Sequence, residues 1–292
     1  MRCWGLLPLV LIARGIARLP QPVLLCLAAA ASLLLWPLLA RRRRIAAINL
    51  ALCFPELPEA ERRRLLRANQ RATVMGALEL LRAWYAPSSS LAGLARVEGL
   101  PRLQAALAEG RGVLLFTGHF THTELAVRLL SEALGRPVRV VIRRHNSACL
   151  EAAFERARAR VFGATLAKKD VRGLLRTLQA GEPVVYSADQ NFSYQHAFVP
   201  FFGVSAATLT STPELVRRSH AQALPFWFYR DDDGRYCLRI EAAWPGWIDA
   251  DADQAAAIYM RELESVVREH PEQYLWVHRR FKTRPPGSPA VY

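Results

Sequence analysis

The segment GHFTHTE, residues 118 to 124, places an imidazole and a carboxylate five residues apart, at His119 and Glu124. A carboxylate on one ring nitrogen of a histidine fixes the tautomer and stabilises the imidazolium, so the other nitrogen can take a proton from an attacking hydroxyl. We expect Glu124 to reach the imidazole of His119 and the two to act as a general-base dyad. Spacing alone is a weak signal, because such a pair also arises as a simple helix-capping contact.

Other kinds of chemistry lack their usual residues. His122 adds an H-x-x-H pattern, but no H-E-x-x-H motif accompanies it, and the five cysteines are scattered without a C-x-x-C pair, so we expect no metal site. Neither the G-x-S-x-G turn of serine hydrolases nor a glycine-rich nucleotide loop occurs. The sequence therefore predicts no covalent nucleophile of these types and no cofactor.

Five short apolar runs, bounded by glycine, proline or polar residues, read as strands: 113–117, 138–142, 183–188, 223–230 and 236–243. Helical patterns lie at 45–85, 121–134, 147–162, 170–180, 208–220 and 253–270. This alternation predicts an α/β domain with a mixed, largely parallel central sheet flanked by helices. The turn DDDGR should join the last two strands as an antiparallel hairpin at one edge.

These elements place the candidate residues. His119 falls two residues after the strand at 113–117, and Asp189 directly follows the strand at 183–188. Ligands of α/β sheets bind outside the carboxyl ends of the strands. We therefore expect both side chains at that edge of the sheet.

Charge and hydropathy point to a membrane. The net charge of +14 calls for an acidic partner, either nucleic acid or an anionic membrane surface. Arg41 to Arg44 form a basic run directly after an uncharged apolar stretch at 22–40, as expected where a chain leaves a bilayer on the cytoplasmic side. No zinc-finger or RNP-like pattern is present, so nucleic acid is not an expected partner.

The stretch at 22–40 is close to the minimum length for a membrane-spanning helix. We predict a transmembrane helix there, preceded by an interfacial segment, so that residues 1–44 form a membrane anchor and residues 45–292 the catalytic domain. Pro37 and the marginal length keep open the alternative that the segment lies in the interface.

Several motifs resemble one family. They are NLALCFPELPEAERRRLL from Asn49, GHFTHTEL from Gly118, DVRGLLRTLQAGEPV from Asp170, FVPFFGVSAAT from Phe198 and PEQYLWVHRRFKTRP from Pro271. Together they resemble the late acyltransferases of lipid A biosynthesis, the lauroyl and myristoyl transferases of Gram-negative bacteria. The likeness runs from about Ile45 to Tyr292.

This resemblance implies a glycerolipid-acyltransferase-like fold and an enzyme at the cytoplasmic face of the inner membrane, in contact with its anionic lipids. The family takes a fatty acyl group from acyl carrier protein and transfers it to a hydroxyl of Kdo-bearing lipid IVA. Its H-x4-[DE] dyad corresponds to His119 and Glu124, its Arg-x-Arg to Arg158 and Arg160, and its D-[HQ] acid to Asp189.

Acyl transfer from a thioester also needs a group that stabilises the oxyanion and positive charge for the phosphates of the substrates. Arg158 is the candidate for the first task or for holding the dyad. Asp189 could organise that arginine or a loop. The candidates for binding substrate are Arg143, Arg144, Arg160, Arg279, Arg280 and Lys282.

One departure from the family bears on the acceptor. Members commonly read D-Q-D-[YF]-G where this chain has Asp189, Gln190, Asn191, Phe192 and Ser193. The missing carboxylate and glycine leave open the acyl chain length and the acceptor, which could be another glycolipid, an aminolipid or a specialised metabolite. A non-catalytic membrane- or nucleic-acid-binding protein is a further alternative, against which the intact His119 and Glu124 argue.

Overall fold

Seven strands form one sheet in the order β1-β9-β8-β2-β5-β3-β4 in the computed structural model, which describes residues 7–292. The strands are β1 (Ala95–Glu98), β2 (Val113–Thr117), β3 (Arg139–Ile142), β4 (Leu166–Ala167), β5 (Pro183–Ser187), β8 (Gln222–Arg230) and β9 (Tyr236–Ile240). All neighbours are parallel except β8 and β9. The predicted α/β class with a mixed, largely parallel sheet is confirmed.

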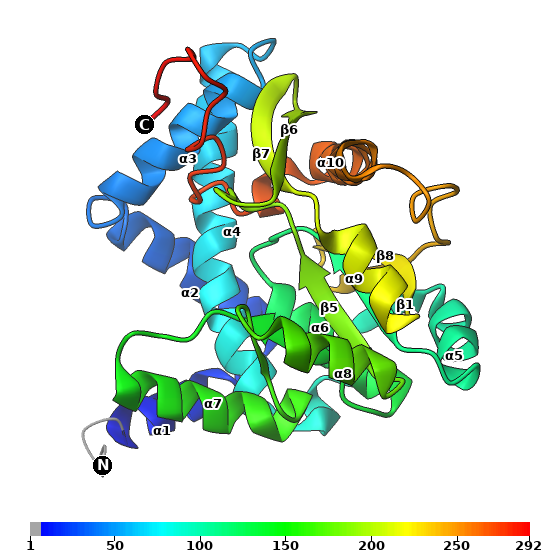
Figure 1. The fold of residues 1–292 in the computed structure, drawn as a ribbon. Helices are drawn as coiled ribbons and strands as arrows, with labels where there is room; N and C mark the ends of the chain where they lie inside the picture. Colours follow the sequence, from blue (N-terminus) through cyan, green and yellow to red (C-terminus); the bar gives the residue numbers. More distant parts are fainter. Residues whose placement is uncertain (1–6) are drawn as a thin grey trace.

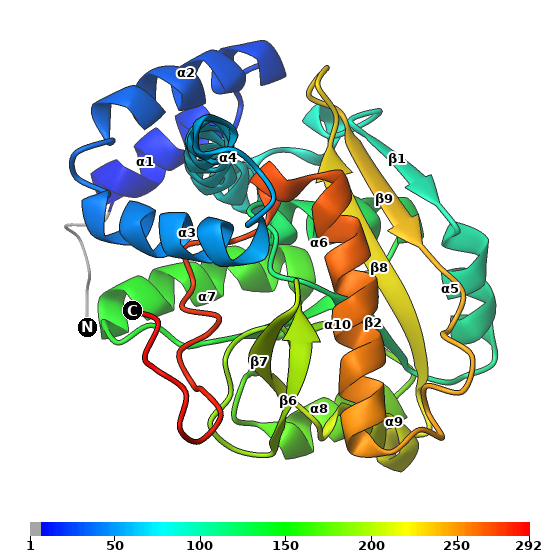
Figure 2. The same cartoon turned by 90° about the horizontal axis from the view of Figure 1, so that it is seen from above.

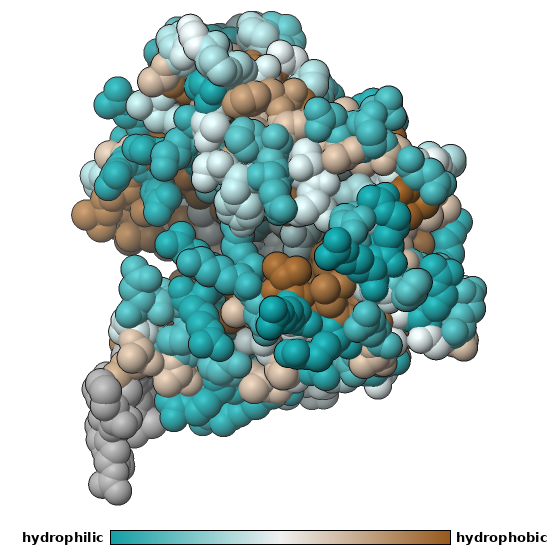
Figure 3. All heavy atoms as spheres, viewed as in Figure 1, coloured by the Kyte–Doolittle hydropathy of each residue, from teal (hydrophilic) through white to brown (hydrophobic). Residues whose placement is uncertain are grey.

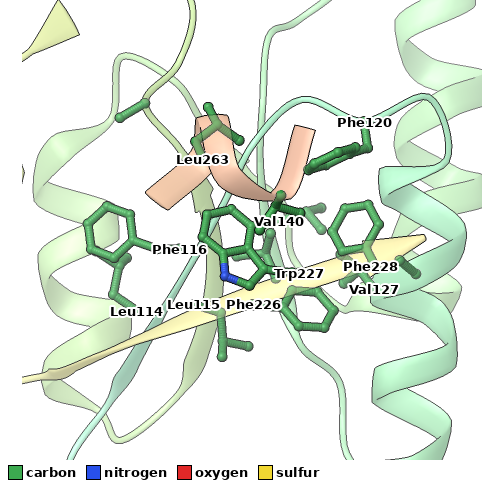
Figure 4. Packing of buried hydrophobic residues seen from close by; sticks show 14 of the residues in the cluster. Leu114, Leu115, Phe116, Phe120, Val127, Val140, Phe226, Trp227, Phe228 and Leu263 are labelled. Atoms are coloured by element: carbon green, nitrogen blue, oxygen red, sulfur yellow. The ribbon is translucent and has the colours of Figure 1, made fainter. Parts of the chain in front are cut away.

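The core is densest around β2, in the middle of this sheet. Every residue of β2 is buried, and four of the five residues in its sequence VLLFT are apolar, as expected of a strand covered on both faces. Figure 4 shows Leu114, Leu115 and Phe116 among the aromatic side chains of β8, such as Phe226 and Phe228. Burying each such side chain contributes roughly 1.5–3 kcal/mol, so β2 is a rigid base for the residues that follow it.

Helices follow most strands and cover the sheet (Figure 1). They are α5 (Leu100–Ala108), α6 (Thr123–Leu134), α7 (Ala148–Phe162), α8 (Val171–Gln179), α9 (Thr212–Ser219) and α10 (Ala252–Glu269). Two of them begin at a capping aspartate: Asp170 accepts a hydrogen bond from the Gly173 amide, and Asp251 from the Gln254 amide. These caps satisfy otherwise unpaired amide groups and explain where α8 and α10 start.

The long helix α4 (Glu59–Tyr85) connects the N-terminal helices to the rest of the molecule. It contacts α1 (Leu7–Ile16), α2 (Gln21–Leu34) and α3 (Ala40–Cys53) as well as α6 and α7. Figure 2 shows the three N-terminal helices gathered around α4, to one side of the sheet. The N-terminal segment is therefore packed on the catalytic part of the chain.

The prediction of one continuous helix over 22–40 is wrong, because the structure divides this stretch between two helices. Helix α2 ends at Leu34, a turn occupies residues 35–39, and α3 begins at Ala40. Pro37 explains the break, because proline lacks an amide hydrogen and its ring clashes with the carbonyl one turn earlier. Within residues 7–292 no helix is both long and apolar enough to cross a bilayer. Residues 1–6 of the predicted anchor lie outside the described part of the chain.

Three strand features were not predicted. Short strands β1 and β4 extend the sheet at its two edges. The hairpin β8–β9 is antiparallel as predicted, but it is not at the edge, because β1 pairs with the outer side of β9. A separate hairpin joins β6 (His196–Phe201) to β7 (Val204–Leu209). Phe202 and Gly203 turn this hairpin with positive φ angles of 53° and 71°. The helix predicted at 208–220 consequently starts later, at Thr212.

Candidate active site

The candidate site lies at the carboxyl ends of β2 and β5, two neighbouring parallel strands. Their register pairs Thr117 with Ser187, the last residue of each strand. His119 and Asp189 each follow two residues later, so the sheet brings together two side chains that are 70 residues apart in the sequence. The expectation that both would lie at this edge is confirmed.

Helix α10 fixes the ends of both strands. The buried hydroxyl of Tyr259 donates a hydrogen bond to the Thr117 carbonyl at 2.8 Å and accepts one from the Ala188 amide at 3.2 Å. A Cβ atom on Gly118 would come within 2.4 Å of Leu263 Cδ1, so a larger residue here would force the Leu263 side chain to move. The turns that carry His119 and Asp189 are therefore anchored to one helix.

Asp189 holds the imidazole of His119. The Nδ1 atom of His119 lies 2.5 Å from Asp189 Oδ1, and the His119 amide donates to Oδ2 at 2.9 Å. The Tyr274 hydroxyl also donates to Oδ2, at 2.8 Å. Burial raises the pKa of Asp189, whereas the charge of His119 and these hydrogen bonds lower it. The lowering is the larger effect, so the pKa of Asp189 lies below its ordinary value. Asp189 is therefore ionised at neutral pH.

The opposite side of the imidazole is open. The side chain of His119 is 32% exposed, whereas that of Asp189 is 1% exposed. None of the described residues, Leu7 to Tyr292, binds His119 Nε2 through a hydrogen bond. A carboxylate on Nδ1 keeps the proton there, which leaves Nε2 as the acceptor. His119 thus has the arrangement of a general base facing an accessible site.

Glu124 has a different partner from the one expected. Its carboxylate accepts hydrogen bonds from Arg158 Nη2 at 2.6 Å, from Arg158 Nε at 3.1 Å and from the Trp84 indole at 2.5 Å. The Arg158 guanidinium also lies 5.0 Å from the centre of the Trp84 ring. Glu124 is in the first turn of α6, which packs on α4 and α7, and its side chain meets the residues of those helices. Asp189 takes the position beside His119 that the sequence spacing had suggested for Glu124.

The loop carrying His119 is held from two sides. On one side a Cβ atom on Gly76 of α4 would lie 2.2 Å from the Thr121 carbonyl oxygen, so only glycine permits this contact. On the other side the C-terminal segment adds backbone hydrogen bonds, from the Thr121 amide to the Gln273 carbonyl and from the Leu275 amide to the His119 carbonyl, both 2.9 Å. The loop is therefore enclosed by parts of the chain distant from it in sequence.

The predicted basic residues separate into two groups. Those at least partly exposed are Arg143, Arg144, Arg160, Arg279 and Lys282. Arg280, in contrast, is 2% exposed and donates to the Ala207 carbonyl at 2.7 Å and to the Thr208 hydroxyl at 2.5 Å. Its buried guanidinium binds β7 from inside the protein. Arg280 therefore has a structural role in place of the substrate contact that the sequence predicted.

Sequence reasoning missed Tyr274 and Lys168. Tyr274 lies in the distinctive C-terminal motif, but its contact with Asp189 depends on tertiary structure. Partial burial and the charge of Arg143 lower the pKa of Lys168, while the charge of Asp189 acts in the opposite direction. Lys168 thus lies within electrostatic range of both Arg143 and the Asp189 carboxylate. The only sequence signal for it was the pair of lysines at 168 and 169.

His122 is a packing residue. It is 2% exposed and makes ring contacts with Phe228 and Tyr236, at centroid distances of 5.3 and 5.5 Å. Burial, aided by the charge of Arg230, lowers its pKa well below the ordinary value, so the ring is neutral. The second histidine of the H-x-x-H pattern therefore points into the core, away from the His119 site.

Comparisons with known proteins identify the family of this chain. Residues 1–283 match the model of the bacterial lipid A biosynthesis acyltransferase family. The lipid A biosynthesis palmitoleoyltransferase of Escherichia coli is 36% identical over 278 residues, covering 94% of this chain and 90% of the relative. The lipid A biosynthesis lauroyltransferase of the same species is 35% identical, covering 95% and 91%. A lipid A biosynthesis acyltransferase of Haemophilus influenzae is 33% identical, covering 86% and 81%.

The family match spans almost the whole chain, and it includes the segments that carry His119, Arg158, Asp189 and Tyr274. The family match therefore shows an enzyme that transfers acyl groups. The chain belongs to the bacterial lipid A biosynthesis acyltransferases.

Proposed function

We propose that this enzyme transfers a fatty acyl chain, of lauroyl or myristoyl type, from acyl carrier protein to a hydroxyl of a Kdo-lipid IVA-type precursor of lipid A. The observation that carries the proposal is the His119–Asp189 pair at the carboxyl edge of the sheet, with Nε2 open to a substrate. Family membership supports the acyl chemistry and the class of acceptor.

In the proposed reaction His119 acts as the base. Asp189 keeps the proton on Nδ1, so Nε2 takes the proton of the acceptor hydroxyl while its oxygen attacks the thioester carbonyl. The C–O bond forms and the C–S bond of the tetrahedral intermediate then breaks. The imidazolium returns its proton to the departing thiolate, which restores the enzyme. Asp189 stabilises the imidazolium during the step in which it carries this charge.

The oxyanion of that intermediate needs a donor, and Arg158 is our candidate. Glu124 binds its Nε and Nη2 atoms. In the part of the chain that the structure describes, no acceptor binds the remaining Nη1 group, which can therefore donate to a developing oxyanion. Glu124 in this scheme is a positioning residue, because it holds the guanidinium of Arg158 against Trp84.

We further propose that the enzyme works on the cytoplasmic surface of the inner membrane, docked through its N-terminal helices. Leu33, Leu34 and Leu38 are 75%, 76% and 78% exposed, and they surround the turn between α2 and α3. Figure 3 shows an apolar area at this turn, next to hydrophilic surface. Arg41 to Arg44 follow immediately, as suits an interfacial segment beside anionic lipid headgroups.

Transfer of a labelled acyl chain from acyl carrier protein to Kdo-lipid IVA in vitro tests the reaction. We expect His119→Asn to lower kcat by roughly a hundredfold or more, because the base is lost while the polar side chain is conserved. The matched control is His220→Asn, at an exposed histidine with a φ of 54°, which asparagine tolerates.

Two results would contradict the proposal. If the wild-type enzyme transferred no label to Kdo-lipid IVA, the proposed acceptor would be wrong. Transfer to a different glycolipid would then identify the alternative acceptor. Equal rates for His119→Asn and the control would show that His119 is not the general base.

A further inference from the structure

A cationic pocket adjoins the candidate active site. The start of α3, the loop after Asp189 and the C-terminal segment enclose about 510 Å³. Four basic side chains line it: Arg41, Arg42, Arg279 and Lys282. Both ribbon views show the C-terminal segment lying beside α3 (Figures 1 and 2).

The basic side chains of this pocket have no ion-pair partner among the residues from Leu7 onward. No carboxylate lines the pocket there, and none of the four basic side chains forms an ion pair with any of those residues. His278 adds no charge at neutral pH, because burial lowers its pKa to about 4. Four cations gathered without an ion-pair partner repel one another, and an anionic ligand reduces that repulsion.

The pocket is joined to the catalytic pair by short connections. The Asn191 amide donates to His278 Nε2 at 3.3 Å, and Asn191 is two residues beyond Asp189. The side chain of Asn191 is tied to Thr283 by two hydrogen bonds of 2.9 and 2.7 Å. The wall of the pocket and the carboxylate that holds His119 thus belong to one hydrogen-bonded loop.

The position of the pocket favours a membrane-bound ligand. Arg41 and Arg42 lie three and four residues after Leu38, the exposed apolar residue at the proposed membrane surface. An anionic headgroup at the level of the interface would meet these arginines first. A lipid held there could extend a hydroxyl-bearing chain toward His119.

We propose that this pocket binds the anionic headgroup of the glycolipid acceptor, through its phosphate or sugar carboxylate groups, and so sets the position of the acceptor hydroxyl at His119. The inference rests on the proposed function and adds the subsite to it. Arginine forks and a lysine ammonium are suited to such oxyanions, which they bind by charge-assisted hydrogen bonds.

Steady-state kinetics with both substrates varied test the pocket. The double variant Arg42→Gln/Lys282→Gln should raise KM for Kdo-lipid IVA by roughly tenfold or more, the loss expected for at least one charge-assisted contact. KM for the acyl carrier protein and the thermal unfolding midpoint should stay unchanged. The matched control is Arg172→Gln/Arg176→Gln, two exposed arginines on α8 with the same change in charge.

A second arm identifies the anion. Acceptors lacking either the phosphates or the Kdo sugars are compared in the wild type and in the double variant. The group bound in the pocket is the one whose removal raises KM in the wild type but has little further effect in the variant.

Three outcomes would overturn the inference: an unchanged acceptor KM in the variant, an equal rise in the control, or a rise confined to the acyl carrier protein, which would make the pocket a donor site. If the double variant does not fold, each substitution is measured singly. If the wild-type enzyme were inactive on every acceptor, the proposed function itself would be wrong.

Discussion

At the scale of single residues, the carboxylate that contacts His119 belongs to Asp189, so substitutions of Asp189 should affect the base directly. Asp189 receives hydrogen bonds from the His119 amide and from Tyr274 as well as meeting the imidazole, so three contacts fix its position. Glu124 makes its contacts with Arg158 and Trp84. The two acids therefore serve different partners.

We expect Asp189→Asn to lower kcat by roughly a hundredfold or more, because an amide of the same shape cannot stabilise the imidazolium and can favour the wrong tautomer. Thermal unfolding of the variant provides the control for folding. If Asp189→Asn transferred acyl chains at the wild-type rate while Glu124→Gln did not, Glu124 would be the acid that serves the base.

The pair formed by Glu124 and Arg158 can be examined in the same assay. Glu124→Gln combined with Arg158→Gln should lose little more activity than the more damaging single substitution, because each removes the same ion pair. Independent, additive losses would contradict a positioning role for Glu124.

At the scale of elements, a buried polar cluster fastens α4 to the hairpin β8–β9 and to the N-terminal helices. Glu79 is fully buried on α4, pairs with Arg230 of β8 and accepts a hydrogen bond from Tyr236 of β9. On the same helix Arg82 donates to the Leu19 carbonyl at 2.9 Å. These groups connect three parts of the chain through one desolvated cluster.

We expect Glu79→Gln to lower the free energy of unfolding by about 3–5 kcal/mol, because it leaves Arg230 as an uncompensated buried charge. Urea unfolding provides the measurement. Glu61→Gln, an exposed change on the same helix, is the matched control and should leave the midpoint unchanged. Identical midpoints for the two variants would show that the buried pair contributes nothing.

The sequence predicted elements with strong local patterns and missed those that depend on distant partners. The apolar run at 113–117 is β2 without change, since a strand buried on both faces has an unmistakable composition. Strands β1 and β4 are too short for a pattern, and they form because β9 and β3 offer free edges. The helix predicted at 22–40 is interrupted at residues 35–39. The prediction relied on hydropathy and gave too little weight to Pro37, which breaks helices.

The same distinction applies to the site. His119 and Asp189 could be placed at one edge of the sheet, because each follows a recognisable strand. Their direct contact depends on β2 and β5 being neighbours in matching register, and spacing along the chain carries no such information. Five residues of separation therefore favoured Glu124, whose helix turns its side chain toward Arg158.

At the scale of the whole molecule, the exposed leucines around the turn between α2 and α3 define how the enzyme would meet a membrane. Leu33, Leu34 and Leu38 are each at least three-quarters exposed, and large apolar side chains grouped in this way mark a surface that contacts a partner. Their neighbours Arg41 to Arg44 supply charge for anionic headgroups. One end of the molecule would thus enter the interface, while the catalytic sheet stays in water.

We expect the triple variant Leu33→Ser/Leu34→Ser/Leu38→Ser to bind vesicles containing anionic lipid at least roughly tenfold more weakly, because each leucine contributes about 1.5–3 kcal/mol when buried. Co-sedimentation with the vesicles gives the bound fraction. Val171→Ser, at an apolar residue that is 56% exposed on α8, is the control and should bind as the wild type does. Undiminished binding by the triple variant would place the membrane contact elsewhere.

The C-terminal segment has a consequence for how the enzyme is made. Leu275 and Gln273 supply backbone partners to the loop of His119, and Tyr274 supplies a hydroxyl to Asp189. A ribosome must therefore have synthesised the chain through Leu275 before the base can be held in place. A nascent chain that already contains His119 and Asp189 still lacks a working centre, so activity begins only once synthesis has passed this segment.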